Sequence, residues 1–398
     1  MIEKPECRIL QVFGTLGTGG AETWLIALLK YFKENHEAFP FRLSVHIFLT
    51  NDVKSVFDDE AELLGATLHY SKYTRSNLIG FIRDWRRVLR DYNFHVIHDH
   101  QEHTSGLHFL MGLGHLPKIK IAHVHNPLLS LRIYSSSFIR KSTVRFGQIL
   151  VALFGTHILG TSKQLIIEQG YFRPLFSHLV REPVYCGFDT SKFSGDHSEQ
   201  FRLLSQEFNW PTSSKILLFV GRLNSSENED INQKNPAFAL EVAKICAEKD
   251  PSFRFLMVGG GEPVLNRLTE QVARWGLDEQ IKLTGRRADI PRIMIGSHLF
   301  ILPSLAEGLG MVVVEAQAAG LMSLVSDVTP RECSVDDTKV QFISLEDGKE
   351  FWASKVLDLM KTPRTNEGES NAAVRSSEFS IVNSAAKLIK IYTKNIRT

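Results

Sequence analysis

Two glutamates eight positions apart, Glu307 and Glu315, are the residues of this chain whose type and spacing point most directly to chemistry. They lie in the segment 303–320, PSLAEGLGMVVVEAQAAG, on either side of a glycine-containing turn that precedes an apolar helix. Backbone N–H groups at Gly308–Gly310 and the positive end of the helix could bind a phosphate. Carboxylates beside a phosphate are favourable when hydroxyl groups donate hydrogen bonds to them. The pattern therefore predicts a ligand that carries both phosphate and polyol groups, such as a nucleotide sugar.

The distance between the two glutamates fits such a ligand. A helix rises 1.5 Å per residue, so eight residues span roughly 12 Å, about the length of a sugar diphosphate with its ribose. The alternative is that Glu307 is an exposed loop acid and Glu315 an ordinary helix residue. The apolar surroundings of Glu315 in VVVEAQAA favour a functional role, because a charge is rarely buried there without a partner.

Two cations are candidates for binding the phosphates. Arg222 directly follows a predicted strand, and Lys234 precedes a predicted helix that starts at Asn235, as the cap, and Pro236. Fixed cations stabilise the charge that develops on a departing diphosphate, and they do so without a metal. Both could instead be solvated charges. The intervening loop is long and acidic, so the position of Lys234 depends on how that loop folds.

Histidines follow two predicted strands, in VIHDHQEH (96–103) and IAHVHNP (121–127). We expect His125 to orient or hydrogen-bond a sugar and His123 to be structural. Alternate positions on a strand are taken to face opposite sides of the sheet, so neither H-x-H pair is expected to chelate an ion. No metal site is predicted.

A glycine-rich loop, GTLGTGG (14–20), separates the first predicted strand from an apolar helix. Gly19 and Gly20 could let the backbone approach a diphosphate or a sugar closely. The spacing does not match a dinucleotide-binding motif, and the alternative is simply a tight turn between strand and helix.

The composition excludes several classes of protein. The 398 residues are 43% apolar and 23% charged, and 46 basic and 44 acidic residues leave a net charge of +2, so no nucleic-acid partner is expected. No apolar run reaches the ~18 residues of a membrane span, and the first residues do not resemble a signal peptide. Four scattered cysteines predict neither a zinc site nor a disulfide framework. We expect a cytoplasmic protein.

Apolar strand-like runs alternate with helical patterns along the chain, which predicts an α/β fold with two doubly wound parallel sheets. The polar segment 187–214 predicts the hinge. We predict one domain over residues 1–190, a second over residues 191–379, and a last helix over 380–398 that packs back on the first domain. The ligand site is expected in the cleft between the domains. The predicted strands are 8–13, 43–49, 67–70, 96–98, 121–124, 157–161, 215–220, 253–258, 281–284, 299–302, 322–326 and 340–343, with 184–185 strand-like.

Two segments suggest contact with a membrane surface. Residues 76–92 and 131–146 each combine apolar and aromatic side chains with several arginines or lysines. For 76–92, a helix that covers the sheet and has a solvated basic face is the favoured interpretation. For 131–146, a sheet-covering helix and a lipid-binding surface are equally open.

The motifs together resemble glycosyltransferase family 4, the retaining group 1 glycosyltransferases of the GT-B fold, and most closely the bacterial members that build exopolysaccharide or other surface glycans. GT-B enzymes have two Rossmann-like domains that face each other across a cleft. The resemblance covers nearly the whole chain and is most specific between Phe219 and Ala319. The motifs are GTGGAE (17–22), HVHN (123–126), FVGRL and QKNP (219–236), MVGGGE (257–262), LTGRRADI (283–290) and EGLGMVVVE (307–315).

The resemblance implies roles for individual residues. Glu307 would bind hydroxyls of the donor sugar and Glu315 the ribose. Arg222 and Lys234 would bind the diphosphate. The remaining matches are Gly308, Leu309 and Gly310 at the phosphates, Arg286 near the base, His125 near the reacting sugar, and Gly19 and Gly20 in the glycine loop of the first domain.

The expected activity is transfer of a hexosyl or N-acetylhexosaminyl unit from a nucleoside diphosphate sugar, with a UDP-sugar favoured, to a glycan or lipid-linked acceptor. The resemblance implies retention of the anomeric configuration and no metal or other cofactor. Peripheral contact with the inner face of the plasma membrane is a further expectation. The alternatives are a nucleotide-sugar 2-epimerase of the same architecture and a catalytically silent subunit that binds a sugar nucleotide.

Overall fold

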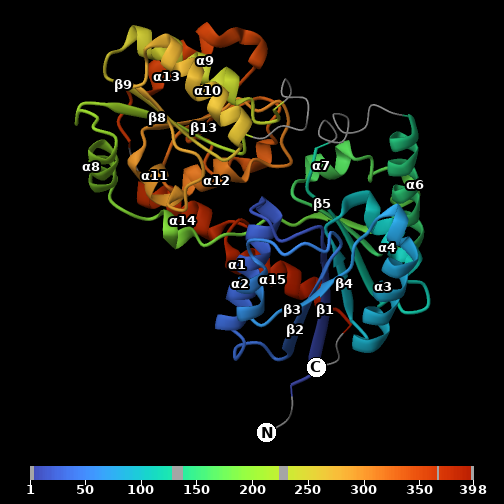
Figure 1. The fold of residues 1–398 in the computed structure, drawn as a ribbon. Coiled ribbons are helices and arrows are strands. Elements are labelled where there is room, and N and C mark those ends of the chain that lie inside the picture. The colour runs from blue at the N-terminus through green and yellow to red at the C-terminus, as the bar shows by residue number, and fades with distance from the viewer. Residues whose placement is uncertain (1–3, 128–137, 224–231, 365–366, 396–398) are drawn as a thin grey trace. The chain divides into compact units, whose positions relative to one another are not determined.

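The computed structural model describes residues 4–127, 138–223, 232–364 and 367–395, and the chain divides into two compact units (Figure 1). Unit 1 comprises Met1–Phe188 together with Glu378–Thr398, and unit 2 comprises Asp189–Ser377. The sequence-based domain boundaries lie after residues 190 and 379.

Unit 1 contains a parallel sheet whose strand order is β3-β2-β1-β4-β5-β6-β7. The order reverses between β1 and β4, as in a doubly wound fold, so their carboxyl ends mark the switch point of this sheet. The strands are β1 (Glu6–Phe13), β2 (Arg42–Leu49), β3 (Thr67–Tyr70), β4 (Val96–Asp99), β5 (Ile119–Val124), β6 (His157–Gly160) and β7 (Val180–Pro183).

Helices cover both faces of this sheet (Figure 1). Leu10 and Val12 of β1 point to the face where Trp85 and other buried residues of the overlying helices pack. The opposite face carries α1 and the C-terminal helix α15, joined by a hydrogen bond of 3.0 Å from Trp24 Nε1 to Ser384 Oγ. The helices of unit 1 are α1 (Gly20–Glu34), α2 (Asp58–Leu63), α3 (Leu78–Tyr92), α4 (Ser105–Met111), α6 (Phe138–Phe154), α7 (Lys163–Glu168) and α15 (Ile381–Tyr392).

Unit 2 repeats the same topology with the parallel order β10-β9-β8-β11-β12-β13, which reverses between β8 and β11. Its strands are β8 (Lys215–Val220), β9 (Phe253–Val258), β10 (Ile281–Leu283), β11 (Leu299–Leu302), β12 (Ser323–Ser326) and β13 (Val340–Ile343). Its helices are α8 (His197–Glu207), α9 (Pro236–Lys249), α10 (Glu262–Trp275), α11 (Ile290–Gly296), α12 (Met311–Ala318), α13 (Gly348–Leu359) and α14 (Glu367–Ser376). The predicted α/β fold with two doubly wound parallel sheets is confirmed.

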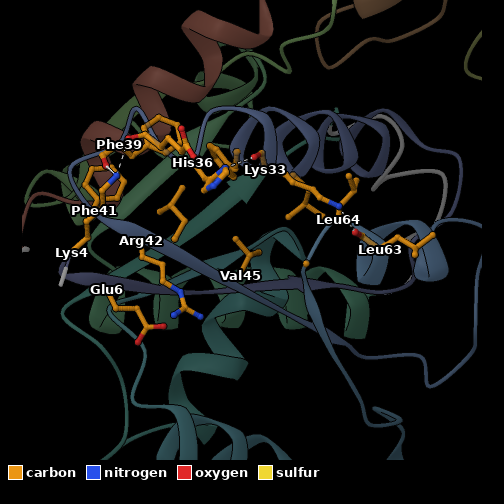
Figure 2. A pocket seen from close by; sticks show the side chains of 15 residues that line it. Lys4, Glu6, Lys33, His36, Phe39, Phe41, Arg42, Val45, Leu63 and Leu64 are labelled. Carbon is orange, nitrogen blue, oxygen red and sulfur yellow. Dashed lines mark hydrogen bonds between the residues drawn. The ribbon is translucent and has the colours of Figure 1, made fainter. Parts of the chain in front are cut away.

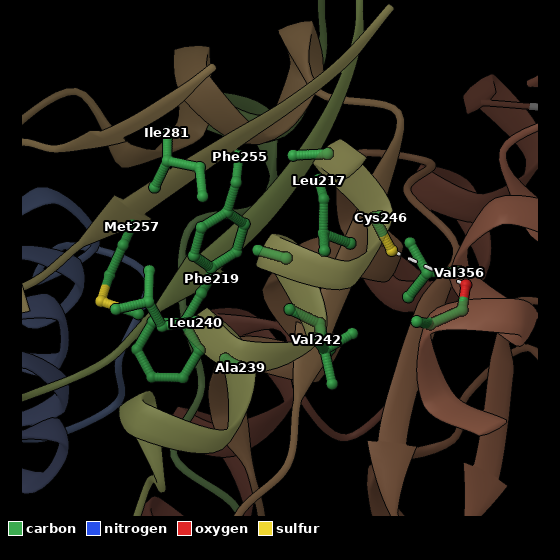
Figure 3. Packing of buried hydrophobic residues seen from close by; sticks show 14 of the residues in the cluster. Leu217, Phe219, Ala239, Leu240, Val242, Cys246, Phe255, Met257, Ile281 and Val356 are labelled. Carbon is green, nitrogen blue, oxygen red and sulfur yellow. Dashed lines mark hydrogen bonds between the residues drawn. The ribbon is translucent and has the colours of Figure 1, made fainter. Parts of the chain in front are cut away.

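The core of unit 2 lies between its sheet and α9 (Figure 3). Leu217, Phe219 and Phe255 project from β8 and β9 towards Leu240 and Cys246 of α9, and all five are fully buried. Each large apolar side chain buried in this way contributes about 1.5–3 kcal/mol to folding. This core fixes β8 and α9 relative to each other, and therefore fixes the loop that connects them at the candidate site.

One strand prediction is wrong. Residues 184–185 are not in a strand, and β7 lies four residues earlier, at Val180–Pro183. Its sequence, VREP, contains two charges and a proline and pairs with β6 at the edge of the sheet, where a proline is tolerated. Every other predicted strand coincides with an observed one to within two residues at each end.

Candidate active site

The carboxyl ends of β8 and β11 form the switch point of the unit 2 sheet, the position where open α/β sheets bind ligands. β8 ends at Val220 and leads through Gly221 to Arg222. β11 ends at Leu302 and leads into the loop that holds Glu307. The two motifs that the sequence separates by more than eighty residues therefore start from adjacent strands.

A buried ion pair joins these two motifs. Lys234 Nζ lies 2.5 Å from Glu307 Oε1, and Ser304 Oγ donates to the same oxygen at 2.6 Å. The side chain of Glu307 is only 4% exposed and that of Lys234 is 20% exposed. A carboxylate with two donors on one oxygen is held in a fixed orientation, and its other oxygen remains available as an acceptor.

Main-chain pairing places Lys234 against Glu307. Leu305 N donates to Gln233 O at 2.8 Å, and Gln233 Nε2 donates to Ala306 O at 2.8 Å. The segment before α9 is thus bonded to the loop after β11 through both the main-chain carbonyl and the side-chain amide of Gln233. Residues 224–231 of the long acidic loop lie outside the described residues, but this pairing fixes the position of Lys234.

The predicted start of α9, with Asn235 as the cap residue and Pro236 in the first turn, is correct. Asn235 adopts a left-handed conformation with φ 53°, and its side chain makes no capping hydrogen bond. Asn232 instead stabilises this turn, because its Oδ1 accepts from Lys234 N at 3.0 Å and its Nδ2 donates to Leu223 O at 2.8 Å. The aliphatic part of Lys234 lies over Gly221.

Glu315 projects from α12, which begins directly after the loop that carries Glu307. It is half-buried, and burial raises its pKa to about 7, an effect that the nearby Lys234 charge opposes. A carboxyl group with a pKa near 7 is partly protonated at neutral pH, and it loses its proton more readily when a hydrogen-bond donor binds beside it.

The turn between the two glutamates is buried over Gly308, Leu309 and Gly310. Gly310 has φ +90° and is the cap residue of α12. A side chain there would be strained by this φ and would press against Thr329. Glycine is therefore required at position 310 to start the helix at this point.

The two predicted arginines follow β8 and β10, which lie on either side of β9 in the sheet. Arg222 is exposed after β8. Arg286 follows β10, and its side chain covers Gly260 in the glycine turn after β9. Glu307, Glu315, Lys234, Arg222 and Arg286 thus all lie at the carboxyl-end edge of the unit 2 sheet, although their ligand contacts remain predictions.

The histidines of unit 1 form a connected cluster, which corrects the expectation about the H-x-H pairs. Residues two apart on a strand face the same side, so the rings of His98 and His100 lie tilted against each other with centroids 4.1 Å apart, and those of His123 and His125 stack at 4.2 Å. The expectation that each pair points to opposite faces is wrong. β4 and β5 are neighbours, and the four rings gather on the side of the sheet that carries α1 and α15.

A buried glutamate holds the chain at His125. Glu102 Oε1 accepts from His125 N at 3.3 Å, from Asn126 N at 2.9 Å and from Asn126 Nδ2 at 2.8 Å. Burial raises the pKa of Glu102, although these hydrogen bonds lower it. Glu102 itself has φ 57°, a conformation that non-glycine residues seldom adopt. It orients the turn after β5 and so positions the His125 ring.

Three of the imidazoles, those of His98, His100 and His123, offer nitrogens that lie within 4.8 Å of one another. A zinc ion would need nitrogens about 2.0–2.1 Å from a common centre. His98 Nε2 and His123 Nδ1 instead lie 2.9 Å apart in a direct hydrogen bond, and both nitrogens of His100 are also hydrogen-bonded. The cluster is therefore arranged as a hydrogen-bond network.

The last two glycines of the loop after β1 have backbone angles that other residues can also adopt. Gly19 caps α1 with φ −79°, and neither Gly19 nor Gly20 has a positive φ. A Cβ on Gly20 would contact nothing within 4 Å, so open space adjoins the backbone there. A role of these two glycines in ligand binding remains a prediction.

Comparison with known proteins finds relatives among the glycosyltransferases. Residues 214–362 match the family model for Glycosyl transferases group 1. Over 363 residues the chain is 26% identical to the putative glycosyltransferase EpsF of Bacillus subtilis, covering 88% of this chain and 86% of that protein. It is 23% identical over 359 residues to the capsular polysaccharide biosynthesis glycosyltransferase CapH of Staphylococcus aureus, covering 89% and 90% of the two chains.

Residues 214–362 thus resemble the group 1 glycosyltransferases, and the relatives that match most of the chain are glycosyltransferases. The fold of the chain is that of the GT-B glycosyltransferases. The crystal structure of Anabaena Alr3699/HepE in complex with UDP aligns with this glycosyltransferase with a TM-score of 0.75 and 17% identity, covering 98% of this chain and 100% of the other.

A pocket of about 680 Å³ lies within unit 1 (Figure 2). It is lined by the starts of β1 and β2 and the end of α1, with Lys4, Arg42 and Lys33 among its residues. Ligands of parallel α/β sheets bind at the carboxyl ends of strands, and this pocket is at the amino ends. The residues around Glu307, which follow the carboxyl ends of the unit 2 strands, therefore remain the candidate site.

Sequence reasoning missed Ser304, Glu102, Gln11 and Tyr392 of this glycosyltransferase. Gln11 could have been selected from the sequence, because it is a polar residue within the apolar strand ILQVF. Ser304 and Glu102 had none, since a serine or glutamate in a loop is ordinary. Tyr392 looked like part of an apolar helix face, and its hydroxyl partners are distant in sequence.

Proposed function

We propose that this glycosyltransferase transfers a hexosyl or N-acetylhexosaminyl unit from a nucleoside diphosphate sugar, with a UDP-sugar favoured, to a glycan or lipid-linked acceptor in surface polysaccharide biosynthesis, in the cytoplasm. The observation that carries this proposal is the buried Glu307 carboxylate, held by Lys234 and Ser304 at the β8/β11 switch point. The capsular biosynthesis named for CapH and the UDP bound by HepE support the acceptor class and the nucleotide.

Each residue of the unit 2 site has a proposed task. The bond from the anomeric carbon to the diphosphate breaks, and Arg222, Lys234 and the Gly308–Gly310 turn take up the charge that develops on the departing phosphate oxygens. Glu307 accepts hydrogen bonds from donor-sugar hydroxyls and Glu315 from the ribose. Arg286 lies near the base, and retention of configuration without a metal follows the family pattern.

A panel of UDP-, GDP- and ADP-sugars tests this function by thermal stabilisation followed by product analysis. A ligand at 100 times its dissociation constant stabilises the fold by about 2.7 kcal/mol. We expect a UDP-sugar to raise the unfolding temperature most and to yield a glycosylated acceptor. An altered sugar nucleotide in reactions without acceptor would indicate an epimerase instead, and binding without any turnover would indicate a silent subunit.

The raised pKa of Glu315 predicts a pH dependence of donor binding. Ribose hydroxyls hydrogen-bond the ionised carboxylate, so binding must lower a pKa that stands at about 7 in the free protein. The dissociation constant of a UDP-sugar should therefore rise as pH falls below 7, by up to about tenfold per pH unit. Calorimetric titration from pH 8 to pH 5.5 measures it. Glu315→Gln is the control and should flatten the profile; an equally steep profile in this variant contradicts the assignment.

Segments 76–92 and 131–146 were both expected as candidates for contact with a membrane surface, and the helices α3 and α6 distinguish between them. On α3, Arg83 and Arg87 approach Asp84 at 3.5 and 3.4 Å and Arg90 pairs with Asp91 at 3.0 Å, so the two aspartates of this helix offset part of its basic charge, as on the solvated face of a sheet-covering helix. The first part of segment 131–146, up to residue 137, lies outside the described residues. No described helix is long and apolar enough to cross a bilayer.

The exposed face of α6 differs from that of α3 in its charge and apolar content, and we propose that it contacts anionic lipid. Phe146, Ile149 and Leu153 are 50%, 38% and 65% exposed at helical spacing. Lys141 and Arg145 are exposed beside them, and α6 contains no acidic residue. An exposed apolar stripe flanked by cations, on a helix whose sequence has no acidic residue, fits the surface of an anionic membrane, where a lipid-linked acceptor would reside.

Vesicle sedimentation tests this face. The double variant Phe146→Ser, Leu153→Ser should reduce binding to phosphatidylglycerol-containing vesicles at least about tenfold, because each side chain loses about 1.5–3 kcal/mol of burial. Ile79→Ser is the matched control, since Ile79 is 85% exposed on α3. Equal losses in both variants, or equal binding of the wild type to neutral vesicles, would contradict the proposal.

A further inference from the structure

A chain of side-chain hydrogen bonds runs from the middle of β1 to His125. Gln11 is a buried polar residue of β1, and its Oε1 lies 2.9 Å from His100 Nε2. His100 Nδ1 lies 2.8 Å from His125 Nε2. The His100 ring also stacks on Phe13 at a centroid distance of 4.1 Å, which fixes its plane. His125 is therefore connected through one imidazole to an amide that cannot titrate.

A second branch leaves the other end of the same amide. Gln11 Nε2 donates to Tyr392 Oη at 3.1 Å, and Tyr392 Oη lies 2.6 Å from His98 Nδ1. His98 Nε2 lies 2.9 Å from His123 Nδ1. Tyr392 belongs to the C-terminal helix α15 and is 1% exposed, so this branch ties the end of the chain to β1, β4 and β5.

Each imidazole in the network is neutral and carries one proton. Burial is the largest cause that lowers the pKa of each ring, well below its usual range for His98, His100 and His123 and to about 3 for His125. A neutral imidazole has one N–H donor and one acceptor nitrogen. Fixing the proton on one nitrogen therefore decides the role of the other.

The orientation of Gln11 then determines the proton order of the first branch. An amide oxygen only accepts, so His100 Nε2 carries the proton and His100 Nδ1 is an acceptor. His125 Nε2 must donate to that acceptor. The remaining nitrogen of His125, Nδ1, is left with a lone pair.

The second branch is consistent with the same orientation. The amide nitrogen only donates, so Tyr392 accepts from it and directs its own proton to His98 Nδ1. His98 Nε2 then donates to His123 Nδ1, and the proton of His123 resides on Nε2. That nitrogen is buried without a hydrogen-bond partner, and its ring meets Trp24 edge-to-face at 5.5 Å. Turning the Gln11 amide over would reverse every bond in both branches.

We propose that Gln11, acting through His100, positions the proton of His125 on Nε2, so that His125 offers Nδ1 as the acceptor for a sugar hydroxyl. Gln11 and His100 are positioning residues in this account, and the contact with the sugar rests on the proposed function. The opposite tautomer would present an N–H at the same place and would prefer an acceptor group in the ligand.

Long-range ¹H–¹⁵N correlation spectra of the full-length protein labelled in histidine read the tautomers directly. The His125 signals are assigned by their loss in His125→Gln. We expect a protonated Nε2 and an unprotonated Nδ1 in the wild type. In Gln11→Leu the His100 proton is no longer fixed, so the His125 signals should shift to a mixture of tautomers. Gln11→Glu keeps an acceptor oxygen for His100 and should preserve the wild-type pattern.

Transfer assays with a UDP-sugar provide the second readout. We expect Gln11→Leu to lower kcat/KM about tenfold, as for loss of one oriented hydrogen bond, and Gln11→Glu to stay within about twofold of wild type. A His125 protonated on Nδ1, or wild-type His125 signals in Gln11→Leu, overturns the proposal. The expected spectra combined with unchanged transfer in Gln11→Leu overturn the sugar contact. The spectra need no sugar, so a failure of the proposed function is distinguished from a failure of this inference.

Discussion

Replacement of Glu307 by alanine is expected to abolish transfer, with a loss in kcat of at least about 10³-fold, while the protein stays folded. The carboxylate is the acceptor proposed for the donor-sugar hydroxyls, and alanine leaves nothing in its place. The fold should survive because Lys234, its partner, is 20% exposed and can be hydrated. We expect a decrease in the free energy of unfolding of about 1–3 kcal/mol from the lost ion pair and the unpaired Ser304 hydroxyl.

Two further variants test whether the effect is specific to the carboxylate of Glu307. Glu307→Gln keeps an acceptor for Ser304 but loses the charge, so its activity should lie between wild type and alanine, because hydrogen bonds to a charged acceptor are about twice as strong. Glu270→Ala, at an exposed position on α10, should leave transfer unchanged. Wild-type turnover in Glu307→Ala would refute the role of Glu307.

Replacement of Lys234 by methionine should lower kcat by about 10²–10³-fold, the usual effect of removing one group that stabilises transition-state charge. Methionine retains the aliphatic packing over Gly221 and removes only the ammonium group. Lys234 Nζ lies 2.5 Å from Glu307 Oε1, so the variant also leaves the carboxylate without its cation. We expect a smaller effect on the dissociation constant of the donor than on kcat, since charge on the diphosphate grows as the bond breaks.

Lys244→Met is the matched control for Lys234, because Lys244 lies on α9 and faces Glu248 at 3.6 Å on the helix surface. Steady-state rates and donor binding are measured for both variants. Equal rates in the two would show that Lys234 serves the fold and not the reaction.

The fold was predictable largely because its sheets are buried on both sides. The strands KILLFV, FRFLMV and LFIL are almost continuous apolar runs, and β8, β9 and β11 have the predicted bounds. β7 was missed because VREP is a polar edge strand whose pairing depends on its neighbour β6. Local sequence cannot show that partner.

The unit 2 residues could be selected from sequence because each lies in the loop after a strand of a parallel sheet or in the first turns of the helix that follows, and such strand ends converge. What sequence could not supply is the pairing between them. The bond from Lys234 to Glu307 depends on Gln233 bridging to Leu305 and Ala306, across 72 and 73 positions in the chain. The raised pKa of Glu315 likewise results from the burial of its helix.

The histidine cluster shows the same limit in unit 1. Gln11 and Tyr392 are 381 positions apart, yet they share a hydrogen bond because α15 returns to the face of β1. The incorrect expectation for the H-x-H pairs had a different cause, the geometry assumed for residues two apart on a strand. With that corrected, a common face for His98 and His100 follows from sequence alone.

The central claim is that unit 2 binds a nucleoside diphosphate sugar through Lys234, Arg222 and the two glutamates. A crystal structure of the protein with a bound UDP-sugar tests it most directly. The account predicts diphosphate oxygens within hydrogen-bond distance of Lys234 Nζ, sugar hydroxyls at Glu307 and ribose hydroxyls at Glu315. A nucleotide bound in the pocket of Figure 2, or a ribose remote from Glu315, would contradict it.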